Sequence, residues 1–130
     1  MTLPLKHSVA VLIRNGDRLL AIRRPNDDDE LPGIWGLPAG SCRGAETVED
    51  VIRRIGRTKL GVVLQPLRKV TFGAQDRLSY RLEMELWEAT MGGTPTYPEW
   101  QWAKYQILGH GAAKGSLCCS LALETKGRVG

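Results

Sequence analysis

The sequence has no long apolar stretch, because no run approaches the roughly 20 residues that a membrane-spanning helix needs. The first six residues also lack the apolar core and the cleavage-like site of a secretion signal. Internal repeats and low-complexity segments are missing as well. We therefore expect neither a membrane protein nor a secreted one.

Cysteine and histidine are scarce, and their spacing matches no zinc or redox motif. There are three cysteines, of which Cys118 and Cys119 are adjacent, and there is no CxxC pair. Adjacent residues are poor disulfide partners, so a reducing cytoplasm is the expected setting. His7 and His110 have no partner spacing typical of a triad or a zinc site. Without a nearby histidine in the sequence, Cys42 is not treated as a nucleophile.

The composition is that of an ordinary globular protein with a mild excess of positive charge. Hydrophobic residues make up 42% of the 130 residues, charged residues make up 25%, and the net charge is +4. This length fits one domain that covers residues 1–130. The positive balance suits phosphate-rich ligands, but because there is no long basic run we do not expect nucleic-acid binding.

The hydrophobic pattern alternates between strand-like and helix-like segments. The expected strands cover residues 7–14, 18–23, 34–37, 62–72, 78–87 and 100–107, and the expected helices cover 47–60 and 112–125. In the strand 78–87, the side chains expected on the buried face are Leu78, Tyr80, Leu82, Met84 and Leu86. This order of elements predicts an α/β (α+β) fold, a mixed β-sheet flanked by helices.

The expected helix 47–60 carries signals at both ends. Thr47, with Asp50 three residues later, resembles a capping box that satisfies two backbone donors. Gly61 is placed to end the helix in the left-handed conformation. The apolar stripe of this helix consists of Val48, Val51, Ile52 and Ile55. Because Gly56 costs about 1 kcal/mol relative to alanine inside a helix, packing must hold this segment.

The most informative stretch runs from residue 33 to residue 62. It opens with the lead-in Trp35-x-Leu37-Pro38-x-Gly40, and the fixed positions that follow at the family's spacing are Glu46, Arg54, Gly61 and Val62. The pattern resembles the Nudix box, Gly-x5-Glu-x7-Arg-Glu-hydrophobic-x-Glu-Glu-x-Gly-hydrophobic. The resemblance to MutT-like Nudix proteins implies an α/β/α sandwich. In the working enzymes of that family it also implies metal-dependent hydrolysis of nucleoside diphosphate-linked compounds.

The resemblance fails at the positions where the family holds its metal. The three box glutamates are replaced by Ile55, Thr58 and Lys59. Mg²⁺ prefers oxygen ligands, whereas isoleucine has no ligand atom, threonine has a neutral hydroxyl, and the lysine charge repels the ion. We therefore expect no cofactor here. If hydrolysis persists, Mg or Mn is expected as the cofactor, and the fallback ligands are Glu46 and Glu49.

A few charged residues are candidates for ligand binding. The Lys59 ammonium either extends into solvent, where it favours the helix C-terminus, or replaces the missing metal charge and holds a phosphate. Arg23 and Arg24, at the end of one strand, and Glu83, on the polar face of another, are the other candidates.

Other charged residues near the motif are expected to be structural. Arg54 matches the family arginine that orients a catalytic glutamate, and here we expect it to pair with Glu46. Four acids are clustered in the loop 25–33, namely Asp27, Asp28, Asp29 and Glu30. We expect them to be solvated rather than to bind a cation.

Three functions follow from this sequence. The first is a Nudix-like domain that binds a nucleotide, another phosphorylated small molecule or a partner protein, with hydrolysis lost or impaired. The second is an active pyrophosphohydrolase with metal ligands from outside the box. The third is a nucleic-acid-associated module. A homo-oligomer is compatible with all three.

Overall fold

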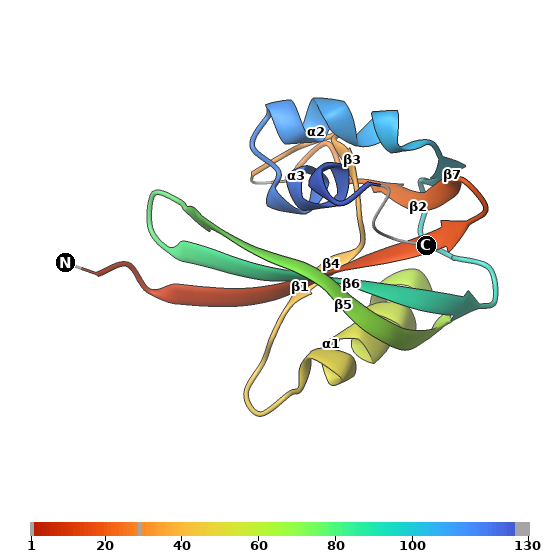
Figure 1. Ribbon diagram of the computed structural model, residues 1–130, viewed down its shortest axis with the longest axis horizontal. Helices are drawn as coiled ribbons and strands as arrows, with labels where there is room; N and C mark the ends of the chain where they lie inside the picture. The colour runs from red at the N-terminus through yellow and green to blue at the C-terminus, as the bar shows by residue number, and fades with distance from the viewer. Residues whose placement is uncertain (1, 29, 127–130) are drawn as a thin grey trace.

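The computed structural model describes residues 2–28 and 30–126, and in them a mixed sheet lies between two helical layers (Figure 1). The strands are β1 (Leu5–Asn15), β2 (Arg18–Arg23), β3 (Trp35–Gly36), β4 (Ala39–Ser41), β5 (Val63–Asp76), β6 (Arg81–Gly92) and β7 (Trp100–Ala103). The helices are α1 (Val48–Arg54), the π-helix η1 (Ile55–Leu60), the 3-10 helix η2 (Tyr105–Leu108), α2 (Gly109–Ala113) and α3 (Leu117–Glu124). The predicted α/β/α sandwich is confirmed.

Strand β1 is the centre of the sheet. It pairs in parallel with β6 and antiparallel with both β2 and β4. Strand β6 pairs antiparallel with β5, and β2 pairs antiparallel with β3 and β7. Because α1 covers one face and α2 with α3 covers the other (Figure 1), β1 is buried on both sides. This position explains its continuous apolar run.

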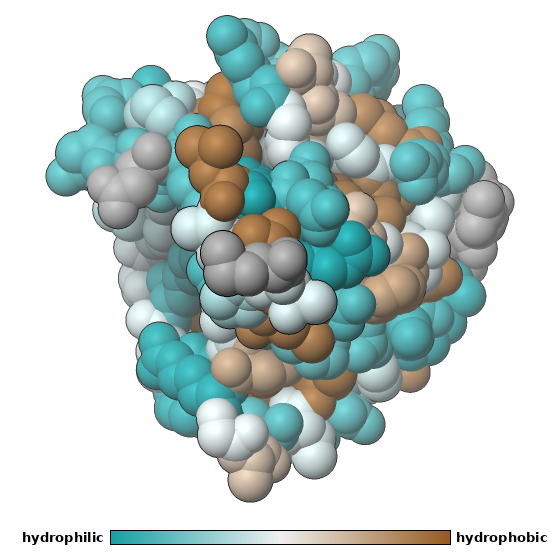
Figure 2. All heavy atoms as spheres, turned by 90° about the vertical axis from the view of Figure 1, so that its left-hand side faces the viewer, coloured by the Kyte–Doolittle hydropathy of each residue, from teal (hydrophilic) through white to brown (hydrophobic). Residues whose placement is uncertain are grey.

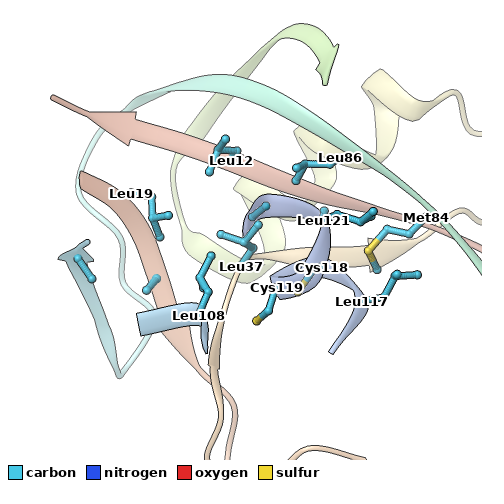
Figure 3. Close-up of a cluster of buried hydrophobic side chains, with 14 of the residues drawn as sticks. Leu12, Leu19, Leu37, Met84, Leu86, Leu108, Leu117, Cys118, Cys119 and Leu121 are labelled. Atoms are coloured by element: carbon cyan, nitrogen blue, oxygen red, sulfur yellow. The ribbon is translucent and has the colours of Figure 1, made fainter. Parts of the chain in front are cut away.

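Two apolar clusters fill the space between the sheet and its helices. On the side of α1, the buried residues of β1 are Val9, Val11 and Ile13, which pack with Ile52, Ile55 and Leu60. On the side of α3, Ala10 and Leu12 pack with residues such as Leu37, Met84 and Leu121 (Figure 3). Among the described residues, no helix is long and apolar enough to cross a membrane.

The motif helix begins as predicted but changes its geometry halfway. Thr47 caps α1, and the reciprocal hydrogen bonds with Asp50 are both 3.1 Å long, so the predicted capping box is confirmed. From Ile55 onward the helix is wound as a π-helix, which ends at Gly61 with a φ of 71°. The backbone N–H groups of Gly61 and Val62 both donate to the Gly56 carbonyl. Ile55, Thr58 and Lys59 stand where the box has its glutamates, and we call these the degenerate positions. They therefore lie on a wider helix than predicted.

The strand predicted over 78–87 begins later, at Arg81. Leu82, Met84 and Leu86 are buried and Tyr80 packs against the same cluster, as predicted, but Leu78 is fully exposed at 103%. The reason is a turn, closed by a hydrogen bond from the Arg77 N–H to the Tyr80 carbonyl, which delays the start of β6. This turn lies at the end of the molecule seen in Figure 2, where hydrophobic atoms alternate with hydrophilic ones.

Several other element boundaries differ from the predictions for local reasons. Pro38 ends the apolar segment 34–37, but the chain goes on to pair with β1. The Pro38 carbonyl accepts a hydrogen bond from the Val11 N–H, and β4 follows at once. Strand β5 continues to Asp76 through the segment predicted as a connection. The strand predicted over 100–107 ends at Ala103, where the chain turns into η2. The helix predicted over 112–125 is two helices, separated at Gly115 by a φ of 97°.

The fold makes a prediction at Gly56. A Cβ at this position would lie 2.8 Å from Leu64 Cγ and 3.0 Å from the Val62 carbonyl oxygen. We expect Gly56→Ala to lower the free energy of unfolding by about 1–3 kcal/mol, because overpacking outweighs the better helix propensity of alanine. Urea denaturation followed by circular dichroism measures this change.

Gly109 in α2 provides the matched control. A Cβ there meets nothing within 4 Å. Gly109→Ala should therefore leave the stability unchanged or raise it by up to about 1 kcal/mol. Equal effects of the two substitutions would show that the close approach at Gly56 does not exist.

Candidate anion-binding pocket

The loop before α1 is tied to the helix by one ion pair. Arg54 Nε and Nη2 donate to the two carboxylate oxygens of Glu46 at 2.8 and 3.0 Å, and Nη2 also donates to the Ser41 carbonyl at 2.6 Å. The Arg43 N–H donates to Glu46 as well. The hydrogen bond from Arg54 holds the pKa of Glu46 below its usual range. The predicted pairing of Arg54 with Glu46 is confirmed, and both oxygens of this fallback metal ligand are engaged.

The side chains at the three degenerate positions point in different directions. Ile55 is only 2% exposed and packs beneath Gly40, where a Cβ would lie 3.1 Å from Ile55 Cγ1. The Thr58 hydroxyl donates to the Arg54 carbonyl at 2.7 Å. The Lys59 ammonium crosses to β4 and donates to the Ala39 carbonyl at 3.0 Å. Instead of a cluster of acceptors, this surface presents an apolar side chain, a hydroxyl that is bonded to its own helix, and a cation.

Lys59 reaches into a pocket of about 390 Å³ that opens beside the motif helix. The charged residues that line the pocket are Lys6, Arg24, Lys59, Arg77, Asp28 and Glu30. Its apolar and aromatic lining includes Ile34, Leu37, Leu82, Met84, Tyr80 and Tyr97. Four cations thus face two carboxylates. The pocket combines a positive balance with apolar walls, which suits a small anionic ligand that also has an apolar part.

The carboxylates of the pocket are already engaged in its structure. Asp28 accepts from Arg24 through both oxygens at 3.1 Å and from the Leu31 N–H at 2.8 Å. Although burial opposes the shift, these hydrogen bonds lower the pKa of Asp28. Glu30 accepts from the Tyr80 hydroxyl and lies 3.9 Å from Arg77. Asp28 therefore holds the loop 25–33 together and is not the solvated acid that was predicted. Asp29 lies outside the described residues.

Lys59 is the cation best placed to meet a ligand. Across residues 2–28 and 30–126, no carboxylate lies within ion-pair distance of its ammonium. Lys59 is exposed as a residue and lines the pocket, where the surrounding protein takes water away from its ammonium. This desolvation lowers the pKa of Lys59, and the positive charge of Arg24 lowers it further. A bound anion would restore the solvation that the ammonium has lost.

The other predicted site residues are not gathered in this pocket. Arg23 is held by Glu99, Asn26 and the Gly33 carbonyl, beside a separate cavity of about 270 Å³. Glu83 does not line either cavity and lies 3.8 Å from Arg81. Glu49 is exposed in the first turn of α1. Arg23 and Glu83 therefore do not line the pocket that Lys59 lines, and their contact with a ligand stays a prediction.

The pocket also contains residues that the sequence did not indicate. Lys6, Arg77, Tyr80 and Cys118 come from the N-terminal strand, the β5–β6 turn and α3. No spacing signal links these positions, because the parallel pairing of β1 with β6 and the docking of α3 bring them together.

A second cluster, on the opposite face of the sheet, joins residues that are distant in the sequence. His7 Nδ1 lies 3.8 Å from Cys42 Sγ, and His7 Nε2 lies 3.2 Å from Glu85. This order resembles a nucleophile, a base and an orienting acid. However, burial raises the pKa of Cys42, and the charges of Glu46 and Glu85 raise it further. The thiol is therefore held in its protonated form, and Cys42 lines neither cavity.

Comparison with known proteins identifies the family to which the motif belongs. The model of the NUDIX domain matches residues 4–114. Nucleoside triphosphatase NudI of Escherichia fergusonii is 33% identical over 72 residues, which are 54% of this chain and 51% of the relative. The aligned region thus spans about half the length of that protein.

Solved structures share the fold at low sequence identity. The E. coli ORF135 protein has a TM-score of 0.80 at 16% identity, over 98% of this chain and 94% of the other. The MutT protein from Methanosarcina mazei Go1 has a TM-score of 0.73 at 18% identity, over 83% of each chain. These likenesses concern the fold alone.

The ion pair between Glu46 and Arg54 predicts a pH-dependent loss of stability. Because the folded pKa of Glu46 is lowered, its contribution is present above the unfolded value of about 4.3 and is lost as the pH falls through the folded pKa. We expect Glu46→Gln to destabilise the protein at pH 7 and to differ less from the native protein near pH 3. Denaturation curves at both pH values measure the difference, and an equal loss at both would contradict this role.

Proposed function

The chain belongs to the Nudix family, and on that premise we propose that it binds a nucleotide or another phosphorylated small molecule, with metal-dependent hydrolysis lost or impaired. The observation that carries this proposal is the position of the Lys59 ammonium. It lies 3.0 Å from the Ala39 carbonyl, and Lys59 lines a pocket with a positive balance of charge. In the resemblance to the Nudix box, this position belongs to a glutamate that holds the metal.

The donor set of the degenerate positions does not fit Mg²⁺ or Mn²⁺. Ile55 is buried without a ligand atom, and the Thr58 proton is donated to the helix backbone. Lys59 places a positive charge against the carbonyl that faces it. Within the described part of the chain, no three His, Cys, Asp or Glu side chains lie close enough together to hold a metal ion. A hard divalent cation needs several oxygen ligands, and this surface supplies a neutral oxygen and an ammonium.

The same geometry favours a phosphate. Lys59 is desolvated and has no carboxylate partner among the residues that the structure describes, so an anion gains a charge-assisted hydrogen bond without displacing an ion pair found there. Arg24 lies near enough to affect the pKa of Lys59, and its own ion pair with Asp28 fixes its position. The apolar walls, which include Leu37 and Tyr97, would contact the rest of the ligand. Recognition would then depend on Lys59 for charge and on the walls for shape.

An active pyrophosphohydrolase is the alternative that the NudI relative favours, because its name describes a nucleoside triphosphatase. Such an enzyme would need metal ligands from outside the degenerate positions. Glu46 could serve only if it left its bidentate pair with Arg54. In either case the three cysteines are free thiols, which supports the cytoplasm as the proposed setting. Binding to nucleic acid is not part of the proposal, and oligomerisation is left open in it.

The proposal is tested by binding and turnover measured side by side. Calorimetry in EDTA with nucleoside di- and triphosphates and sugar-linked diphosphates should identify a ligand that binds without metal. For that ligand, Lys59→Met should weaken binding about tenfold to a hundredfold, because it removes one charge-assisted hydrogen bond. Arg57→Met is the matched control, since Arg57 is exposed on the same π-helix and does not line the pocket.

The turnover arm uses the same panel with Mg²⁺ or Mn²⁺, and we expect no metal-dependent product. Metal-dependent product that disappears in Glu46→Gln would establish the hydrolase instead. Unchanged binding by Lys59→Met would remove the proposed role of the ammonium. Binding that falls steeply with salt for DNA or RNA would point to a nucleic-acid ligand.

A further inference from the structure

Two adjacent thiols lie at the start of α3, against the wall of the pocket. Ser116 caps this helix of eight residues, and Cys118 and Cys119 belong to its first turn. Figure 3 shows both cysteines on α3 beside Leu37. Cys118 is one of the residues that line the pocket, and it is only 7% exposed.

The surroundings of the two sulfurs differ. Cys119 Sγ donates toward the Trp35 carbonyl at 3.7 Å, so its proton has an acceptor. Cys118 Sγ lies 3.3 Å from the Ser116 hydroxyl, which also accepts from the Cys119 N–H. Gly36 lets the backbone approach both sulfurs, because a Cβ there would lie 3.6 and 3.8 Å from them. Cys119 therefore donates toward the backbone, whereas Cys118 shares a contact with a hydroxyl in which either group can donate.

The two thiols also differ in their ionisation. The neighbouring Cys119 thiol lowers the pKa of Cys118 against the effect of burial, with help from Ser116, the Leu37 N–H and the charge of Arg24. The Cys118 thiol and burial raise the pKa of Cys119. A position in the first turn of a helix also favours a thiolate.

Cations face Cys118 from two other elements. Arg24, at the end of the β2 segment, and Lys59, on η1, both interact with it electrostatically. Arg24 is paired with the carboxylate of Asp28. Cys118 thus shares a cavity of about 390 Å³ with Lys59, an ammonium that has no ion pair with a carboxylate in the described part of the chain.

We propose that Cys118 is a nucleophile inside the pocket and that it is alkylated selectively by small electrophiles that carry an acidic group. In this reaction the sulfur of the Cys118 thiolate attacks the electrophilic carbon. The S–C bond forms as the bond to the leaving group breaks, and the leaving group departs with the electron pair. The acidic group is held by Lys59 and Arg24. The inference goes beyond phosphate binding and does not require that the pocket takes a nucleotide.

Iodoacetate and iodoacetamide are the matched probes, because they differ in charge at nearly the same size. The folded protein is treated with each reagent, and the modified cysteines are mapped by mass spectrometry over time. Cys42 serves as the internal control, since it is partly exposed and outside the pocket. We expect the preference for iodoacetate over iodoacetamide to be at least tenfold greater at Cys118 than at Cys42. The rate at Cys118 should reach half of its maximum at a pH below about 8.5, which is the midpoint for an ordinary thiol.

Variants separate the contributions to this reactivity. Cys118→Ser should remove the fast reaction with iodoacetate, whereas Cys42→Ser should retain it. Lys59→Met should reduce the charge preference at Cys118, and Cys119→Ala should slow the reaction by removing the neighbouring thiol. If Cys118 reacts no faster than Cys42, shows no charge preference, or reacts only in urea, the proposal is wrong. Because the mapping uses the native protein, this result does not depend on whether Cys118→Ser folds, nor on whether any nucleotide binds.

Discussion

The hydrogen bond from the Lys59 ammonium to the Ala39 carbonyl joins the end of the motif helix to β4 and, through β4, to the central strand β1. Two close contacts make this approach possible. Gly40 packs on Ile55, and Gly56 leaves room for Leu64. The backbone therefore places a side chain of the π-helix against the strand edge at which the pocket begins. Everything proposed for the pocket depends on a cation being held at this junction.

If metal-dependent hydrolysis is lost or impaired, as we propose, charge explains how the family's fold can persist without it. The contacts that hold the motif loop, chiefly the ion pair of Arg54 with Glu46 and the capping box at Thr47, involve no divalent ion. The apolar stripe on α1 packs on β1 and also needs no metal. The metal-binding glutamates of the family are replaced only at positions 55, 58 and 59. Replacing carboxylates there by an ammonium turns a cation-binding surface into one suited to an anion.

Local signals account for the parts of the fold that the sequence predicted. The bounds of β2, the capping of α1 and the end of the helical segment at Gly61 all depend on residues within a few positions of one another. The contact between Lys59 and Ala39 spans 20 residues, and it requires the pairing of β4 with β1, which Pro38 had obscured. The turn at Arg77 that exposes Leu78 likewise overrides a regular alternation of apolar residues.

The residues of the pocket were the hardest part to predict, because they too are brought together by contacts between segments that are distant in the sequence. Tyr80, Arg77 and Cys118 meet the motif only because β6 lies parallel to β1 and α3 covers the same face. Glu83, a candidate for ligand binding from the sequence, lies on β6 and does not line the pocket, so its contact with a ligand stays a prediction. Lys59 could be recognised from the motif, since its position in the box is fixed by spacing alone.

The most direct test of the account is a titration with Mn²⁺ followed by electron paramagnetic resonance. The native protein is compared with the double variant Thr58→Glu, Lys59→Glu, in which Ile55 is left unchanged because it is buried beneath Gly40. The account predicts that Mn²⁺ stays free in the presence of the native protein and binds to the folded double variant. Tight binding of Mn²⁺ beside residues 55 to 59 of the native protein would contradict it.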